Sequence, residues 1–338
     1  MRSDRPQAST PIGSSGIFWL QAHKHFSLRT RRENTKVLGC FATYGLLSFH
    51  LRIRDRLWRG LMDKQLNNAV AQAMRESARK AILPRFKLGE AIAADWKAAG
   101  EAVTVADRES EAILSNKLDR LLPGVNIVGE EAAHDNPEIL AHLSRGDCWI
   151  IDPLDGTGNF AAGKIPFGVL VALVQDGLPV SGWILDPLTD RFCAAQANCG
   201  ATINDEIFHV RPPQRSRPQV AVTQLFADIE MRTELFANLQ NKFDMLDSPR
   251  CAADQYPRIA LGENDVTLFT RTIAWDHAAG VLFLNEAGGR AARPDGSPYR
   301  CEDAHAGLIA ATCSILWEDI AGNLVKAGIN LKGAAQDL

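Results

Sequence analysis

Apolar residues recur every three or four positions in the stretch that follows residue 61, which is the spacing of one helical face. They predict a helix from Met62 that Pro84 closes. A second helix is predicted after Thr104 and ends at Pro123-Gly124. The apolar positions of the two helices are Leu66, Val70, Ala73, Met74, Ala78 and Ile82, then Ile113, Leu114, Leu118 and Leu121.

The pattern then changes to short apolar runs separated by turn residues, which predicts strands. Between the first two runs lie a Gly-Glu-Glu turn at 129–131 and a short helix near Pro137 to Leu143. Turn signals at Asp176-Gly177 and Asn204-Asp205 join the later runs into an antiparallel meander. The predicted strands are 125–128, 148–151, 168–175, 180–185, 191–195 and 201–203.

Beyond residue 210 strands and helices alternate, so sheets interleaved with layers of helices are expected. The predicted strands lie near Val220 and at 266–270 and 308–312, and the helices at 227–242, 276–287 and 315–326. We divide the chain into an N-terminal α+β part, 62–210, and a C-terminal α/β part, 211–330.

Residues 1–61 do not show the pattern of a fold. They carry 11 basic and three acidic side chains, whereas the rest of the chain carries 26 basic and 37 acidic ones. Three interpretations stay open: a poorly ordered basic extension, a start codon chosen too early, or an Arg-rich targeting segment. The acidic body does not favour nucleic-acid binding.

The seven cysteines are scattered and include no C-x-x-C pair, which favours reduced thiols in a cytoplasmic protein. The longest apolar run, Val37 to Leu51, has 15 residues, whereas a membrane-spanning helix needs about 20. We therefore assign no membrane-spanning helix.

The most informative segment is Asp152-Pro153-Leu154-Asp155-Gly156-Thr157, which follows a buried strand. Pro153 stiffens the turn, so that both carboxylates can face one cavity. Glu130 upstream and Asp276 downstream bring further acids. Four converging carboxylates need cations, and hard oxygen ligands without a Cys or His cluster indicate Mg²⁺.

Gly-Glu-Glu at 129–131, Asp-Pro-Leu-Asp-Gly-Thr at 152–157 and Trp-Asp-His-Ala-Ala-Gly at 275–280 occur in this order. In these motifs the chain resembles the inositol monophosphatase-like family of Mg²⁺-dependent, lithium-sensitive phosphatases. The resemblance runs from about Met62 to about Ile329. It implies the layered α-β-α-β-α sandwich of the inositol monophosphatase and fructose-1,6-bisphosphatase type, and a homodimer.

By the same resemblance, two or three Mg²⁺ ions are held by Glu130, Asp152, the Leu154 carbonyl, Asp155 and Asp276. The expected reaction is hydrolysis of a small phosphomonoester by metal-activated water without a covalent intermediate. Inositol phosphates, sugar phosphates and nucleotide bisphosphates are the candidate substrates.

The resemblance gives catalytic roles to Glu130, Thr157 and Asp107. The Thr157 hydroxyl and Asp107 would orient the attacking water, while Asp107 also suits a plain helix N-cap. The substrate-binding set is Asp155, Gly156, Thr157 and Asp276, with the phosphate at the amides of Gly156 and Thr157. Asp276, at the start of a helix, suits capping as well.

Two departures argue against inositol specificity. Arg250-Cys251-Ala252-Ala253 stands where the inositol-selective branch has Gly-Ser-Ala-Ala, and Phe269 stands where that branch has a glutamate. Whether Lys97, Arg250 or Arg271 touches the substrate is left open, and His277 is expected to pack beside the site. The alternatives to an enzyme are a regulatory protein that binds nucleic-acid machinery and a degenerate family member.

Overall fold

We analysed a computed structural model, which describes residues 63–96, 102–223, 229–304 and 307–331. All of them belong to one compact unit, residues 45–338. The basic extension 1–61 and Lys97 lie outside the described residues. Among the described residues, no helix is long and apolar enough to cross a membrane.

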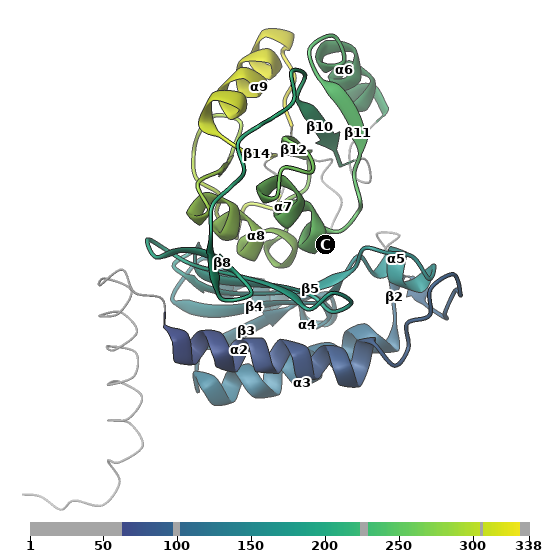
Figure 1. Ribbon diagram of the computed structural model, residues 1–338. Helices are drawn as coiled ribbons and strands as arrows, with labels where there is room; N and C mark the ends of the chain where they lie inside the picture. Colours follow the sequence, from purple (N-terminus) through teal and green to yellow (C-terminus); the bar gives the residue numbers. More distant parts are fainter. Residues whose placement is uncertain (1–62, 97–101, 224–228, 305–306, 332–338) are drawn as a thin grey trace, which may run out of the picture. The chain divides into compact units, whose positions relative to one another are not determined.

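The first layer consists of two helices, α2 (Lys64–Ser77) and α3 (Val105–Leu121), as predicted. The carboxylate of Asp63 accepts hydrogen bonds from the first amides of α2, and Thr104 caps α3. After α2 the chain makes a π-helical turn, η1 (Ala78–Ile82), and leaves the helix just before Pro84. Both helices lie on the same face of a large sheet (Figure 1).

That sheet has seven strands in the order β3-β4-β5-β6-β7-β8-β9. The pair β3 and β4 is parallel and every later pair is antiparallel, which confirms the predicted meander. The short strands β1 and β2 form a separate pair. The bounds are β1 Asp95–Trp96, β2 Ala102–Val103, β3 Asn126–Gly129, β4 Asp147–Asp155, β5 Gly168–Gln175, β6 Leu178–Asp186, β7 Arg191–Gln196, β8 Gly200–Ile203 and β9 Glu206–Phe208.

The Gly-Glu-Glu and Asp-Pro-Leu-Asp segments differ from the prediction. Instead of a turn, Glu130 opens a short helix, α4 (Glu130–Asp135), before the 3-10 helix η2 (Pro137–Leu143). Strand β4 does not end at Ile151 but continues to Asp155, with a register shift between Asp152 and Asp155 against β5. A bulge of this kind re-aims side chains, which here turns both carboxylates to one place.

A second sheet of five strands has the order β11-β10-β12-β14-β13. Helices α7 and α8 lie between the two sheets, and α6 and α9 cover the outer face of the second one (Figure 1). The bounds are β10 Gln219–Val222, α6 Ile229–Leu239, β11 Asp244–Asp247, α7 Ala252–Ala260, β12 Val266–Phe269, α8 Ala274–Glu286, β13 Arg290–Ala292, β14 Leu308–Ala311 and α9 Ser314–Ala327.

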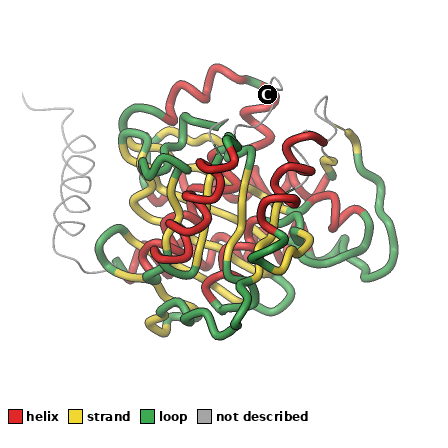
Figure 2. Tube along the Cα trace, turned by 90° about the horizontal axis from the view of Figure 1, so that it is seen from above, coloured by secondary structure: helices red, strands yellow, loops and turns green. Residues whose placement is uncertain are grey.

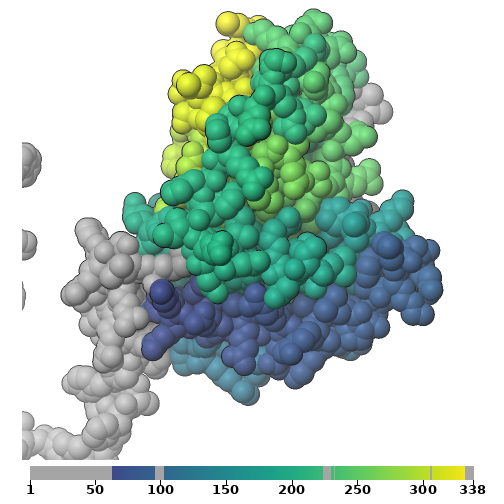
Figure 3. Space-filling model, viewed as in Figure 1, coloured from purple at the N-terminus to yellow at the C-terminus, as the bar shows by residue number. Residues whose placement is uncertain are grey.

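The layers therefore follow the expected order α-β-α-β-α, which Figure 1 shows from the side. Figure 2 looks down onto the stacked layers, and Figure 3 gives the view of Figure 1 as a space-filling surface. Each layer buries apolar side chains against the next: Trp149 and Trp183 face α2 and α3, and Ile150 and Ile184 face α8. Strands β9, β11 and β13 and helix α7 were not predicted.

Candidate active site

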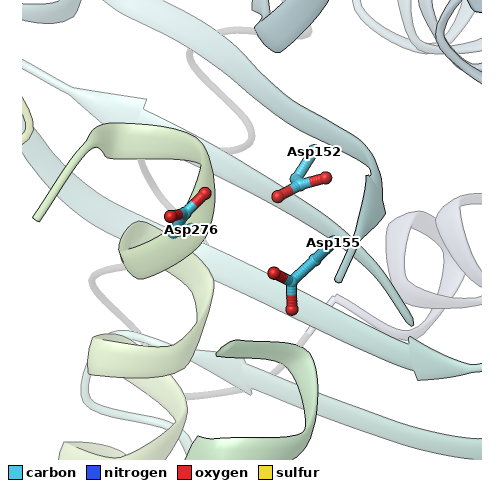
Figure 4. Close-up of side chains that lie close together, drawn as sticks. All are labelled: Asp152, Asp155 and Asp276. Atoms are coloured by element: carbon cyan, nitrogen blue, oxygen red, sulfur yellow. The ribbon is translucent and has the colours of Figure 1, made fainter. Parts of the chain in front are cut away.

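Three carboxylates from two layers meet at the end of β4. Asp152 and Asp155 come from the bulged strand, and Asp276 comes from the first turn of α8 (Figure 4). One oxygen atom of each lies within 4.8 Å of the other two. The sequence-predicted residues Asp152, Asp155 and Asp276 are thus brought together, and we call them the acidic trio.

The electrostatics of the acidic trio suit a bound cation. Burial raises the pKa of Asp152 well above its usual range, and the charges of Glu130, Asp155 and Asp276 raise it further. Burial likewise raises the pKa of Asp155 to about 6. Because like charges at this distance repel, a divalent cation with oxygen ligands is the partner that would let all three ionise together.

Asp155 is oriented by an element that was not predicted from the sequence. Its Oδ2 accepts a hydrogen bond from the Ala253 amide over 2.6 Å, and its carbonyl faces the Cys251 thiol at 3.9 Å. Both residues lie at the N-terminal end of α7, nearly a hundred positions away in the chain. The Cys-Ala-Ala sequence gave one local signal, because small residues allow such a close approach of backbone to a side chain.

Asp276 is not the N-cap residue of its helix. The N-cap of α8 is Ile273, and Asp276 is the third helical residue. Trp275 before it is buried in the core between the sheets. A carboxylate in a first turn is favourable with respect to the helix dipole, and from this position Asp276 faces the strand that carries Asp152 and Asp155.

Gly156 and Thr157 follow Asp155 directly, and Thr157 opens helix α5 (Thr157–Ala161), as expected. Gly156 has φ 80°, and a Cβ there would lie 3.0 Å from the Pro166 carbonyl oxygen, so glycine is required twice over. The Thr157 hydroxyl lies 2.7 Å from the Leu154 carbonyl oxygen and 2.8 Å from Oδ1 of Asp107. A hydroxyl has one hydrogen, so it donates to one of these acceptors at a time.

Asp107 takes part both in the helix start and in the site. It is not the N-cap; Thr104 is, and Oδ2 of Asp107 accepts from the Thr104 amide (2.7 Å) and hydroxyl (2.6 Å). Its other oxygen faces Thr157. Burial raises the pKa of Asp107, although the hydrogen bonds from Thr104 and Thr157 oppose this shift. The contacts to the helix start and to Thr157 therefore coexist in one side chain.

Glu130 is not part of the acidic trio, but its charge is the largest contribution after burial to the raised pKa of Asp152. The helix that Glu130 opens is held by a residue that sequence reasoning missed. Glu111, on α3, accepts hydrogen bonds from the amides of Glu131 (2.8 Å) and Ala132 (2.9 Å). Glu111 lies one helical turn after Asp107, and a second acid on that buried face was the available signal.

His277 packs beside the site, as expected. Its Nε2 lies 3.1 Å from the Arg271 carbonyl and its Nδ1 lies 2.7 Å from the Tyr256 hydroxyl. Burial lowers the pKa of His277 to about 3, so the ring is neutral at pH 7. Phe269 is buried, stacks on Tyr256 and meets the edge of His277.

The two arginines stand in different surroundings. Arg250 is exposed, precedes α7 and has φ 57°, whereas Arg271 is half-buried in the loop before α8.

Away from these residues, a cleft of about 540 Å³ lies between α2 and the β6–β7 turn. Arg75, Leu185, Asp190 and Phe192 are among its lining residues, and none of the predicted site residues reaches it.

The comparisons with known proteins agree with this arrangement. The sequence profile of the inositol monophosphatase family matches residues 63–327. An inositol-1-monophosphatase of Bacillus subtilis is 28% identical over 211 residues, 62% of this chain and 78% of that protein. The Nus factor SuhB of Xylella fastidiosa is 29% identical over 238 residues, 68% of this chain and 82% of that protein.

Among solved structures, the extragenic suppressor protein suhB from Bartonella henselae superimposes with a TM-score of 0.65 at 25% identity. The match covers 77% of this chain and 98% of that one. The expected fold is confirmed, and so is the enzyme class, a phosphoric monoester hydrolase. Since the profile spans most of the sequence and all three acidic motifs, this chain belongs to the inositol monophosphatase family.

Proposed function

We propose that this protein hydrolyses a small phosphomonoester with Mg²⁺ as its cofactor. The observation that carries the proposal is the acidic trio: three carboxylates with an oxygen of each within 4.8 Å of the others, two of them with raised pKa values. A protein that keeps such mutual repulsion at the end of one strand gains from it only when a cation is bound.

In this proposal Asp152, Asp155 and Asp276 hold the metal, and Glu130 and the Leu154 carbonyl complete the ligand set. The bound ion would supply charge neutralisation and a more acidic water. The N-terminal end of α5, where Gly156 allows close approach, would receive the phosphate. These roles are taken from the family pattern onto the residues that match it.

Thr157 and Asp107 are proposed to orient the attacking water. When the Thr157 hydroxyl donates its hydrogen to Oδ1 of Asp107, its oxygen can accept a hydrogen bond from water. Asp107 cannot swing away, because Thr104 binds its other oxygen twice. Glu130 is proposed to take up the water's proton.

The substrate is proposed to carry a second anionic group rather than a polyol ring. The position at which the inositol-selective branch has a glutamate is Phe269, which is 3% exposed and stacks on Tyr256. A buried ring offers no hydrogen bond to a sugar hydroxyl. Arg250 is exposed three positions before Ala253, whose amide binds Asp155, and is the first candidate to meet a second phosphate or a carboxylate.

The test is phosphate release by the full chain over a panel of monophosphates and bisphosphates, with Mg²⁺, with EDTA, and with Mg²⁺ plus Li⁺. Release should require Mg²⁺, and Asp152→Asn should lower kcat by at least 10³-fold. Asp190→Asn is the matched control, because Asp190 lies on the β6–β7 turn and its side chain is 65% exposed. Near-normal turnover in Asp152→Asn would refute the assignment.

A binding role is the second candidate, because relatives named Nus factor SuhB match at similar identity. A folded protein that releases no phosphate from any panel member, yet binds RNA in a salt-sensitive way that is lost on deleting residues 1–61, would favour it. A homodimer and a cytoplasmic location stay predictions, and sedimentation equilibrium would test the first.

A further inference from the structure

The acidic trio is divided between two layers. Asp152 and Asp155 belong to the seven-stranded sheet, whereas Asp276 belongs to a helix packed on that sheet (Figure 4). A cation held by both groups needs the distance between Asp155 and Asp276 to be fixed, because ligand distances in a Mg²⁺ site vary little. Some element must therefore set the position of α8 relative to the end of β4.

Helix α7 contacts both halves. At its N-terminal end, the Ala253 amide donates to Oδ2 of Asp155 over 2.6 Å. One turn later, the Tyr256 hydroxyl lies 2.7 Å from Nδ1 of His277, the residue that follows Asp276. Within four residues α7 thus binds one trio member directly and the neighbour of another.

The direction of the Tyr256–His277 hydrogen bond follows from the third partner. Nε2 of His277 lies 3.1 Å from the Arg271 carbonyl oxygen, and a carbonyl can only accept, so Nε2 carries the hydrogen. In the neutral ring Nδ1 is then the acceptor, and the Tyr256 hydroxyl donates to it. His277 therefore connects α7 to the loop before α8 through both ring nitrogens.

The surroundings make this connection rigid. Tyr256 is fully buried and His277 is 3% exposed. A Cβ on Gly280, one turn after His277, would lie 2.0 Å from the Tyr256 ring, so the ring rests directly against the backbone of α8. Phe269 stacks on the Tyr256 ring with centroids 5.4 Å apart. Neither ring can move without displacing a helix.

We propose that Tyr256 is a positioning residue for the metal site: its hydrogen bond to His277 holds Asp276 at the distance from Asp155 that a cation requires. The inference rests on the proposed function, because only that function assumes a metal ion bound by the acidic trio. It goes beyond that function by assigning part of the affinity for the metal to a side chain outside the proposed ligand set.

The test compares Tyr256→Phe with Tyr299→Phe in the full chain. Both changes remove one buried hydroxyl and keep a ring that lies beside His277, but the Tyr299 hydroxyl donates to the Thr272 carbonyl at 3.4 Å, whereas the Tyr256 hydroxyl is bonded to His277 itself. Mg²⁺ and Mn²⁺ affinities are measured by calorimetry, together with the KM for Mg²⁺ and kcat at saturating Mg²⁺. His277→Gln, which keeps one donor and one acceptor, and His277→Ala provide a second pair.

Tyr256→Phe should weaken the affinity for Mg²⁺ at least fivefold and raise its KM by the same factor, with kcat changed less than threefold. Tyr299→Phe should leave the affinity within twofold of the parent, and His277→Gln should lose less affinity than His277→Ala. Equal Mg²⁺ affinities for Tyr256→Phe and the parent would overturn the positioning role and leave the proposed function standing. A parent protein that binds no Mg²⁺ and releases no phosphate would overturn both.

Discussion

The hydroxyl oxygen of Thr157 lies 2.8 Å from Oδ1 of Asp107, although 50 positions separate the two residues. The contact joins the first residue of α5 to the third residue of α3, so the turn after β4 is tied to the helix layer behind the sheet. Because Thr104 holds the other oxygen of Asp107, the acceptor that Asp107 offers to the Thr157 hydroxyl is fixed before any substrate arrives.

Thr157→Val is expected to lower kcat by about 10²- to 10⁴-fold, the usual contribution of a positioned proton-transfer group. Valine keeps the shape of threonine but cannot donate to Asp107. Thr157→Ser is the matched control and should keep activity within about tenfold, because it retains the hydroxyl. Steady-state kinetics at saturating Mg²⁺ measure both, and activity near that of the parent in Thr157→Val would show that the hydroxyl is not needed.

The sequence predicted the part of the site that is local in the chain. Asp152, Asp155 and Thr157 fall within six residues, so their grouping follows from a strand that ends in a bulge and a helix start. Asp276 was assigned to the site from the Trp-Asp-His-Ala-Ala-Gly motif, because the predicted strands and helices did not show where α8 would lie. The helices α2 and α3 could be predicted because their apolar positions are strongly periodic, and the layer order followed from the family resemblance.

The contacts that orient these residues could not be predicted. Helix α7 has nine residues with Pro257 among them, too short and too irregular for a periodic pattern. Its contacts to Asp155 and His277 depend on how two sheets pack around it, which no local pattern encodes. Helix α4 has only six residues, so Glu130 was placed in a turn.

The metal-free protein should lose stability as the pH rises through about 6. The pKa of Asp155 is raised from 3.8 to about 6 in the folded protein, chiefly by burial. The folded state therefore binds this proton more tightly than the unfolded state. The resulting stabilisation is complete below pH 4 and is lost above pH 6. Asp152 shifts in the same direction.

Asp155→Asn should remove part of this dependence. In EDTA the variant should be more stable than the parent at pH 8, by about 1–3 kcal/mol, with a smaller difference at pH 4. Mg²⁺ should stabilise the parent and not the variant. Denaturant unfolding at both pH values measures this, with Asp190→Asn as the exposed control. A variant less stable than the parent at pH 8 would contradict the electrostatic explanation.

Glu111 should matter for both stability and activity. Its carboxylate accepts the amides of Glu131 and Ala132, and a Cβ on Gly129 would lie 2.3 Å from its Cδ atom. Glu111→Ala removes the acceptor of one buried and one partly buried amide, which should cost about 2–4 kcal/mol of unfolding free energy. It should also lower activity more than tenfold, because Glu130 opens the same helix.

Glu109→Ala is the matched control for that change, since Glu109 lies on the same helix and pairs with Arg85 at the surface. The control should cost less than about 1 kcal/mol. Gly129→Ala should reproduce the effect of Glu111→Ala by displacing its carboxylate. Equal losses in Glu109→Ala and Glu111→Ala, measured by urea unfolding, would argue against the role given to Glu111.

The backbone conformation of Arg250 lowers stability, while its side chain is proposed to bind the substrate. Of the six non-glycine residues described with positive φ, the other five are Asp or Asn, which tolerate this conformation, whereas an arginine there costs about 1 kcal/mol. The backbone around it is pinned, because the Asn159 side chain donates to the Pro249 carbonyl at 3.0 Å and Cys251 faces Asp155. Strain held in place beside a site indicates that the side chain is needed there.

Arg250→Asn should therefore raise the melting temperature by about 2–4 °C, since it relieves the strain without adding the chain entropy of glycine. It should also raise the KM for a bisphosphate about tenfold or more, with a smaller effect on a monophosphate that lacks a second anionic group. Arg145→Asn, at an exposed arginine whose φ is not positive, should change neither quantity. If Arg250→Asn is more stable but equally active on both substrates, Arg250 does not bind the substrate, and the second anionic group loses its support.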